Sequence, residues 1–144
     1  MLGLNSKMNM ITINQLQLIP FPSSSAKEAT LSIFQSPEAV PFAIKRVFTI
    51  HAHEACQRGR HAHKECTQLL VVLRGKCKVI CDDGTSRKDI ILNKPSEGLL
   101  VPPGIWAEQD YEPNTLLMVL TDKPYDESDY IRNYEDYLAY RGVA

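Results

Sequence analysis

All four histidines of the sequence fall within thirteen positions, as two His-x-His pairs, His51 with His53 and His61 with His63. Residues two apart on a strand point to the same face, so each pair would present two imidazoles side by side. Imidazole moves protons near neutral pH and is also the commonest metal ligand in proteins. The pairs therefore predict acid–base catalysis or a metal site, against the simpler alternative of surface or core histidines.

The second pair lies within a longer pattern. It is followed by Gln68 and then, with six residues between, by Gly75. A later block runs from Gly98 to Ala107 and contains Pro102-Pro103-Gly104. These two blocks resemble the two cupin motifs: His-x-His, an acid four or so residues on, a glycine, and then Pro-x-Gly-x-x-His. The resemblance implies an all-β fold, a cupin or jelly-roll antiparallel β-barrel.

Two departures from the cupin pattern bear on metal binding. Metal-binding cupins use both histidines of the first motif, the acid and the second-motif histidine, but here Gln68 and Ala107 stand at the last two positions. Divalent cations normally take three or four basic donors, so two imidazoles and an amide make a poor site. We predict no metal and no other cofactor. The open alternatives are a substitute ligand from Glu65 or Glu108, or a site built from His51, His53 and either Cys56 or Cys66.

The flanking residues resemble one branch of the cupins, the nucleotide-sugar 3,4-ketoisomerases. The shared stretches cover about residues 41–138, and the most distinctive is Tyr125-Asp126-Glu127 followed by Asp129-Tyr130-Ile131-Arg132. These enzymes are similar in fold to dTDP-sugar epimerases. They convert dTDP-4-keto-6-deoxyglucose into its 3-keto isomer without metal or organic cofactor, usually as homodimers that exchange N-terminal strands.

The chemistry of such an isomerisation suits a histidine pair. Moving a ketone from C4 to C3 requires removal of the C3 proton, an enediol(ate), and return of a proton at C4, which neighbouring bases on one face can perform. The resemblance implies that His63 is the base at the sugar and that His61 is its partner or proton relay. The predicted function is therefore a cofactor-free isomerase of deoxysugar biosynthesis, for example for surface polysaccharides. Its expected partners are the nucleotide-sugar substrate and a second copy of the chain.

Five further residues are predicted to bind the substrate. Arg58 would stabilise the enediolate or hold a phosphate, because a guanidinium donates in a fixed fork. Gln68 would hydrogen-bond a sugar hydroxyl, and Trp106 and Tyr111 would stack on thymine or sugar. Glu108 completes the set. The alternatives are a solvated surface for Arg58, a structural role for Gln68 and core packing for the two aromatic residues.

Two other functions remain open at this point. A non-catalytic cupin that binds a nucleotide sugar or carbohydrate is favoured by Thr49 and Ala107, where family members commonly carry an aromatic residue and a His or Arg, respectively. A metal-dependent cupin oxygenase is the third hypothesis, and metal analysis of the purified protein would distinguish it.

Composition bounds the remaining classes. The 144 residues are 44% apolar and 23% charged with a net charge of −1, as in one globular domain, and without the basic excess of a nucleic-acid binder. The longest apolar run, Leu69 to Leu73, is far short of the ~20 residues that span a bilayer, so no membrane partner is expected. The N-terminus lacks a signal-peptide pattern, which predicts a cytoplasmic protein, with Met1, Met8 or Met10 as its start. Its cysteines are expected to be buried, free and inert: Cys56, Cys66, Cys77 and Cys81.

The elements that position these residues follow from short β patterns. We expect N-terminal strands and a loop in residues 1–40, the barrel in 41–121 and a helix in 122–144. Strands are predicted at 10–13, 29–34, 45–51, 68–73, 76–81, 86–92, 98–101 and 115–120, with a loop at 20–25 and a hairpin turn at Asp83-Gly84. The helix should start at Asp126 or Ser128 and reach Leu138. The uncovered edges of the N-terminal strands, with the habit of the family, predict a homodimer in which these strands are exchanged.

Overall fold

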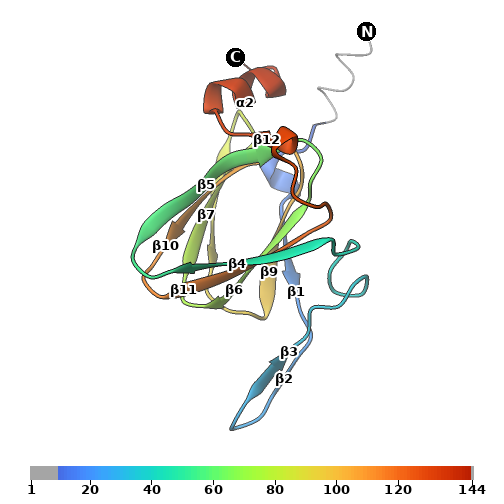
Figure 1. Ribbon diagram of the computed structural model, residues 1–144, viewed down its shortest axis with the longest axis vertical. Coiled ribbons are helices and arrows are strands. Elements are labelled where there is room, and N and C mark those ends of the chain that lie inside the picture. Colours follow the sequence, from blue (N-terminus) through green and yellow to red (C-terminus); the bar gives the residue numbers. More distant parts are fainter. Residues whose placement is uncertain (1–9, 144) are drawn as a thin grey trace.

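The computed structural model describes residues 10–143 and shows two five-stranded antiparallel sheets facing each other (Figure 1). The strands are β1 (Gln17–Pro20), β2 (Ser23–Ser25), β3 (Thr30–Ser32), β4 (Arg46–Ala52), β5 (Cys56–His63), β6 (Gln68–Arg74), β7 (Cys77–Asp82), β8 (Arg87–Leu92), β9 (Glu97–Val101), β10 (Trp106–Tyr111), β11 (Thr115–Thr121) and β12 (Tyr130–Ile131). The helical elements are the 3-10 turns η1 (Ile13–Gln15) and η2 (Glu127–Asp129) and the helix α2 (Tyr134–Arg141).

The sheets have the strand orders β1-β9-β6-β11-β4 and β12-β5-β10-β7-β8, and β2 and β3 form a separate hairpin. Alternating side chains of both sheets, such as Leu70, Val72, Val79 and Leu117, are buried in the core between them. The all-β jelly-roll barrel with a short C-terminal helix is thus confirmed. No helix within residues 10–143 is long and apolar enough to cross a bilayer.

The predicted hairpin turn is also confirmed. β7 and β8 pair up to Asp82 and Arg87, and Gly84 between them has a φ of +96°, which a glycine adopts without steric cost. The Asp83 carboxylate accepts hydrogen bonds from the backbone N–H groups of Thr85 and Ser86 at 2.9 and 2.8 Å. The central strands lie within a residue or two of their predicted limits, but β5 and β10 were not predicted as strands.

The N-terminal elements differ from the prediction. Residues 10–13 were expected to form a strand, yet the chain enters η1, because the Gln15 side chain accepts the Thr12 N–H at 2.8 Å and the Asp83 carboxylate accepts the Ile13 N–H at 2.9 Å. These donors are therefore lost to any strand ladder. The strand predicted at 29–34 shortens to β3 and pairs with β2, which lies in the predicted loop.

The C-terminal helix was predicted to start too early. Asp126 does accept the Ser128 N–H, but it caps only η2. The next two residues form β12, whose Tyr130 and Ile131 pair with His63 and Ala62 at the edge of β5, and this pairing keeps the backbone extended. Helix α2 starts only after Asn133, whose side chain accepts the Asp136 N–H at 3.0 Å.

Candidate active site

A β-bulge in β5 sets the direction of the site residues. Gly59 and Arg60 have positive φ angles of 85° and 61°, and the pairing with β10 shifts by one residue there, from Gly59 opposite Glu108 to His61 opposite Ala107. Residues three apart would normally face opposite sides of a strand, but the extra residue restores Arg58 and His61 to the same inner face. The histidines are thus directed into one end of the barrel.

One ring nitrogen of His63 is hydrogen-bonded and the other has no partner. It is 6% exposed, and its Nδ1 lies 2.9 Å from Oδ2 of Asp129 on η2. Asp129 also accepts the backbone N–H groups of Glu65 and Cys66, which fixes its carboxylate. Nε2 of His63 is buried without a hydrogen-bond partner. The arrangement assigns the proton to Nδ1 and leaves the lone pair on Nε2 available.

Burial keeps both imidazoles neutral at pH 7. It lowers the pKa of His63 below the ordinary 6.5, although the hydrogen bond and the negative charge of Asp129 oppose this shift. Burial and the neighbouring His63 lower the pKa of His61 further, to about 4. His63 is therefore the better base of the two, because a carboxylate stabilises its protonated form.

Aromatic and charged side chains of residues 127–132 form a cover over the His61–His63 pair. The Tyr130 ring contacts both imidazoles, with centroids 4.3 Å from His63 and 4.9 Å from His61. The Arg132 guanidinium lies 4.2 Å from the Tyr130 ring centre and donates two hydrogen bonds to Glu127, at 2.6 and 2.9 Å. These bonds, with one from Tyr125, lower the pKa of Glu127 to about 2. The segment after β11 thus separates the histidines from solvent.

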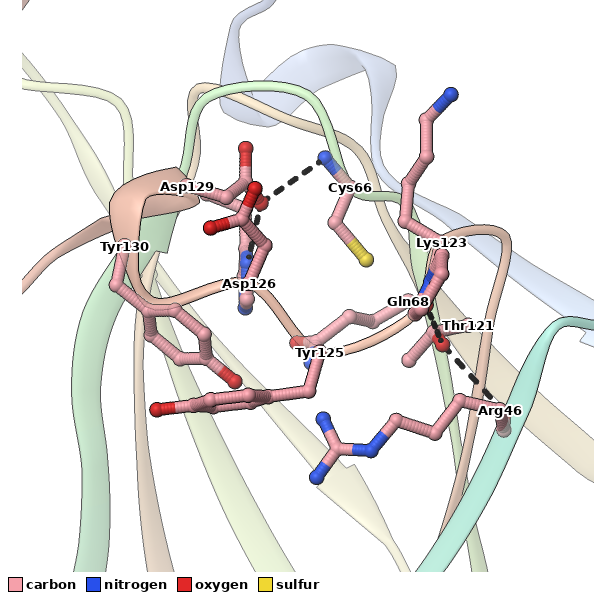
Figure 2. Close-up of a pocket in the computed structure, with 11 residues that line it drawn as sticks. Arg46, Cys66, Gln68, Thr121, Lys123, Tyr125, Asp126, Asp129 and Tyr130 are labelled. Carbon is pink, nitrogen blue, oxygen red and sulfur yellow. Dashed lines mark hydrogen bonds and ion pairs between the residues drawn. The ribbon is translucent and has the colours of Figure 1, made fainter.

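Two neighbouring cavities, which share lining residues, lie beside this segment. The larger, about 200 Å³, is lined by residues of both sheets and of β12: Arg46, Phe48, Ile50, Arg58, Gly59, His61, Gln68, Gln109, Val119, Tyr130 and Arg132. The smaller, about 10 Å³, lies beside His63 and shares Arg46, Gln68 and Tyr130 with the first (Figure 2). Three guanidinium groups and the neutral imidazole of His61 around one hollow suit an anionic substrate that loses a proton.

The predicted substrate-binding residues divide into two groups. Arg58 and Gln68 line the larger cavity beside His61. Trp106 and Glu108 lie on the outer face of β10, where Trp106 packs against Tyr137 and donates a hydrogen bond to Glu108 at 2.9 Å. Tyr111 is part of the core and donates to Gln109. The structure therefore does not bring these three side chains to the histidines.

Several site residues were not singled out from the sequence. Asp129, Tyr130 and Arg132 were recognised only as parts of the C-terminal family motif, whose strict spacing was the available indication. Arg46 and Gln109 carry no such indication, because a lone polar residue on a strand becomes meaningful only when its inward direction is known.

The first histidine pair lies elsewhere. His51 is exposed at the end of β4 and His53 follows it, with ring centroids 4.3 Å apart, on the outside of the barrel. Three cysteines are buried as expected, but Cys56 is exposed, because it starts β5 at the open rim of the sheet. All four are free thiols.

The chain is similar in sequence to proteins of one family. Residues 14–142 match the family model described as FdtA: WxcM-like, C-terminal. A curated relative, the TDP-4-oxo-6-deoxy-alpha-D-glucose-3,4-oxoisomerase of Aneurinibacillus thermoaerophilus, is 39% identical over 126 residues, which are 86% of this chain and 91% of that protein.

Solved structures agree with this match. QdtA, a sugar 3,4-ketoisomerase from Thermoanaerobacterium thermosaccharolyticum in complex with TDP, is 35% identical with a TM-score of 0.86, over 91% of this chain and 97% of that one. A 3,4-ketoisomerase from Helicobacter canadensis is 32% identical with a TM-score of 0.85, over 89% and 98% of the two chains. The resemblance noted in the sequence is confirmed, and the chain belongs to the FdtA family of WxcM-like, C-terminal proteins.

Proposed function

We propose that the protein is an isomerase that moves the keto group of a TDP-4-keto-6-deoxyhexose from C4 to C3 through an enediol(ate). The observation that carries the proposal is the buried His63–Asp129 pair, in which Nε2 of His63 has no hydrogen-bond partner. The neighbouring imidazole of His61 lines a cavity together with three arginines. The curated relative is named as an oxoisomerase of such a substrate, and a His-to-Asn variant of QdtA was solved in complex with TDP-4-keto-6-deoxyglucose.

His63 performs the proton transfers in this proposal. Its Nε2 removes the proton from C3, and Asp129 stabilises the imidazolium that forms. Because C3 and C4 are adjacent, the same nitrogen can return the proton to C4 of the enediolate. His61, with a pKa of about 4, serves as a neutral hydrogen-bonding partner rather than as a store of protons.

The cationic residues stabilise the charges that develop. Arg58 lies on the same face as His61 and would stabilise the enediolate oxygen, or hold a phosphate, while Arg46 and Arg132 hold the diphosphate. Gln68 lines both cavities and can donate to a sugar hydroxyl without competing for the proton. Thr49 is exposed on the outer side of β4, so the residue type at this position does not change the lining of the cavity.

Incubation of the protein with TDP-4-keto-6-deoxyglucose in deuterated water tests the proposal. NMR of the sugar should show the 3-keto isomer, with deuterium at C4 unless the shielded imidazole returns the original proton first. The same solution with the His63→Asn variant is the control. A substrate that stays unchanged with folded wild-type protein would favour a non-catalytic binding role.

The proposal also covers assembly, cofactors and location. We propose a cytoplasmic homodimer in which the N-terminal strands lie on the sheet of the partner. The protein should purify without stoichiometric metal at the cupin position, and its activity should persist in a chelator. Near-equimolar metal bound through both His61 and His63 would contradict this part.

A further inference from the structure

A second set of donors meets at His63 and does not include His61. His63, Cys66 and Asp129 each offer a ligand atom, and the three atoms lie within 4.8 Å of one another, the one such group among residues 10–143. Imidazole, thiolate and carboxylate are the ligands of zinc, at about 2.0–2.3 Å, which places donors about 3.3–3.8 Å apart in a tetrahedron. Movements of roughly 1 Å by these side chains would bring the three ligand atoms to the separations of a tetrahedral zinc site.

The space between these groups fits a single ion. They line the small cavity of about 10 Å³, which is close to the volume needed for one water molecule. Figure 2 shows the sulfur of Cys66 turned from the loop after β5 toward the inside of this cavity. His63 lines this cavity and is 94% buried, and its Nε2 has no hydrogen-bond partner.

Some charged groups around this cavity favour a bound cation and others oppose it. Burial and the carboxylates of Asp122 and Asp129 raise the pKa of the Cys66 thiol to about 11, and the same two negative charges favour a cation. Arg46 and Lys123 line the cavity as well and oppose it. Binding must also release the thiol proton to solvent, which weakens it further. The balance favours a reversibly bound ion over a resident one.

We propose that Zn²⁺ binds between His63, Cys66 and Asp129 and reversibly inhibits the enzyme. The ion takes either Nε2 of His63 or the position of the proton between Nδ1 and Asp129, and both alternatives remove the base from the reaction. The inhibition, but not the binding, rests on the proposed function of His63. The site differs from the metal centre of the cupin pattern, because it does not use His61.

Cobalt tests the binding without substrate. Titration of the purified protein with Co²⁺ should produce a sulfur-to-cobalt charge-transfer band that saturates at one equivalent. The band should be lost in Cys66→Ala and Cys66→Ser, and kept in Cys56→Ala, which removes the exposed thiol. It should also persist in His61→Asn. Absence of the band in the wild type, its survival in both Cys66 variants or its loss in His61→Asn would overturn the site.

Turnover tests the inhibition. Zn²⁺ should reduce isomerisation of TDP-4-keto-6-deoxyglucose by the wild type, and a chelator should restore it. The Cys66→Ala variant should isomerise at the wild-type rate and resist zinc, because the thiol has no part in the proton transfer. Equal zinc sensitivity of variant and wild type would refute the inhibition. If the wild type is inactive even in a chelator, the proposed function fails, whereas the cobalt band still decides the site.

Discussion

At the residue scale, two opposing effects set the protonation state of His63. Burial favours its neutral form, which has the lone pair needed to remove a proton, while Asp129 favours the protonated form that results. Because Asp129 is held by two backbone N–H groups, it can orient the imidazole without moving itself. A general base benefits from such a fixed partner, since the proton stays on Nδ1 and Nε2 keeps its lone pair.

Replacement of His63 by asparagine should leave folding intact and reduce turnover. Asparagine keeps some hydrogen bonding but has no basicity, and general bases contribute about 10²- to 10⁴-fold, or about 3 to 5 kcal/mol of barrier. Substrate affinity should change much less, because we propose that the diphosphate is held by Arg46 and Arg132 and not by His63. Steady-state kinetics and a binding titration with TDP measure the two effects.

Matched variants make this result specific. His51→Asn alters an exposed histidine of the other pair and should turn over at the wild-type rate. The double variant of His61 and His63 should lose much less than the two single losses combined, because the residues act as one unit. A folded His63→Asn variant with the wild-type rate would remove His63 as the base and direct attention to His61.

The lowered pKa of His61 predicts a loss of stability in acid. The unfolded chain takes up this proton near pH 6.5 and the folded protein only near pH 4, so stability is present above pH 6.5 and is lost progressively as the pH falls toward 4. At pH 5 the loss from this group is at most about 2 kcal/mol.

Urea unfolding at pH 7 and pH 5 measures this loss. His61→Asn should lose less of its free energy of unfolding between the two pH values than the wild type does, and the exposed His53→Asn should behave like the wild type. Equal losses for wild type and His61→Asn would show that burial does not hold His61 neutral.

At the scale of elements, the sequence predicts strands better than it predicts their directions. Apolar runs and the Asp83-Gly84 turn located most of the barrel, because burial and turn geometry act locally. The bulge at Arg60 depends on pairing with β10 and could not be found this way, although it decides which side chains enter the cavity. Trp106 and Glu108, which were predicted to bind the substrate, lie on the outer face of β10.

The C-terminal segment shows the same limit. The spacing of its aromatic residues correctly indicated a helix from Tyr134 onward. Tyr130 and Ile131, however, pair with the edge of β5 instead. A contact so distant in sequence outweighs local propensity, and it brings Asp129 to His63. The histidine pair was therefore predictable from its own spacing, whereas its carboxylate partner was not.

Helix α2 should depend on one tyrosine for its attachment. Tyr137 is fully buried, and its hydroxyl lies 2.8 and 2.7 Å from the carbonyl oxygens of Asp82 and Gly104. Tyr137→Phe removes the donor and should lower the free energy of unfolding by about 1–3 kcal/mol. Urea unfolding measures the change, and Tyr140→Phe, at the exposed side of the helix, is the control. Equal stability of the two variants would show that these bonds do not hold the helix.

At the scale of the molecule, the β2–β3 hairpin extends away from the barrel (Figure 1). Its strands have three residues each and pair only with one another among residues 10–143. A two-stranded hairpin is marginally stable in water without further packing. Leu31 on this hairpin is 60% exposed and Val47 on the edge strand β4 is 54% exposed. Both observations favour a second copy of the chain that covers the hairpin and the edge.

The proposed dimer should therefore depend on Leu31. Light scattering of the wild type at micromolar concentration should give twice the mass of the chain, and Leu31→Asp should shift the mass toward the monomer, because an aspartate in an apolar interface loses its hydration. Ile91→Asp is the matched control, since Ile91 is 42% exposed on β8 of the other sheet. A wild type that stays monomeric would contradict the dimer. A dimer that tolerates Leu31→Asp as well as Ile91→Asp would place the interface away from the exchanged strands.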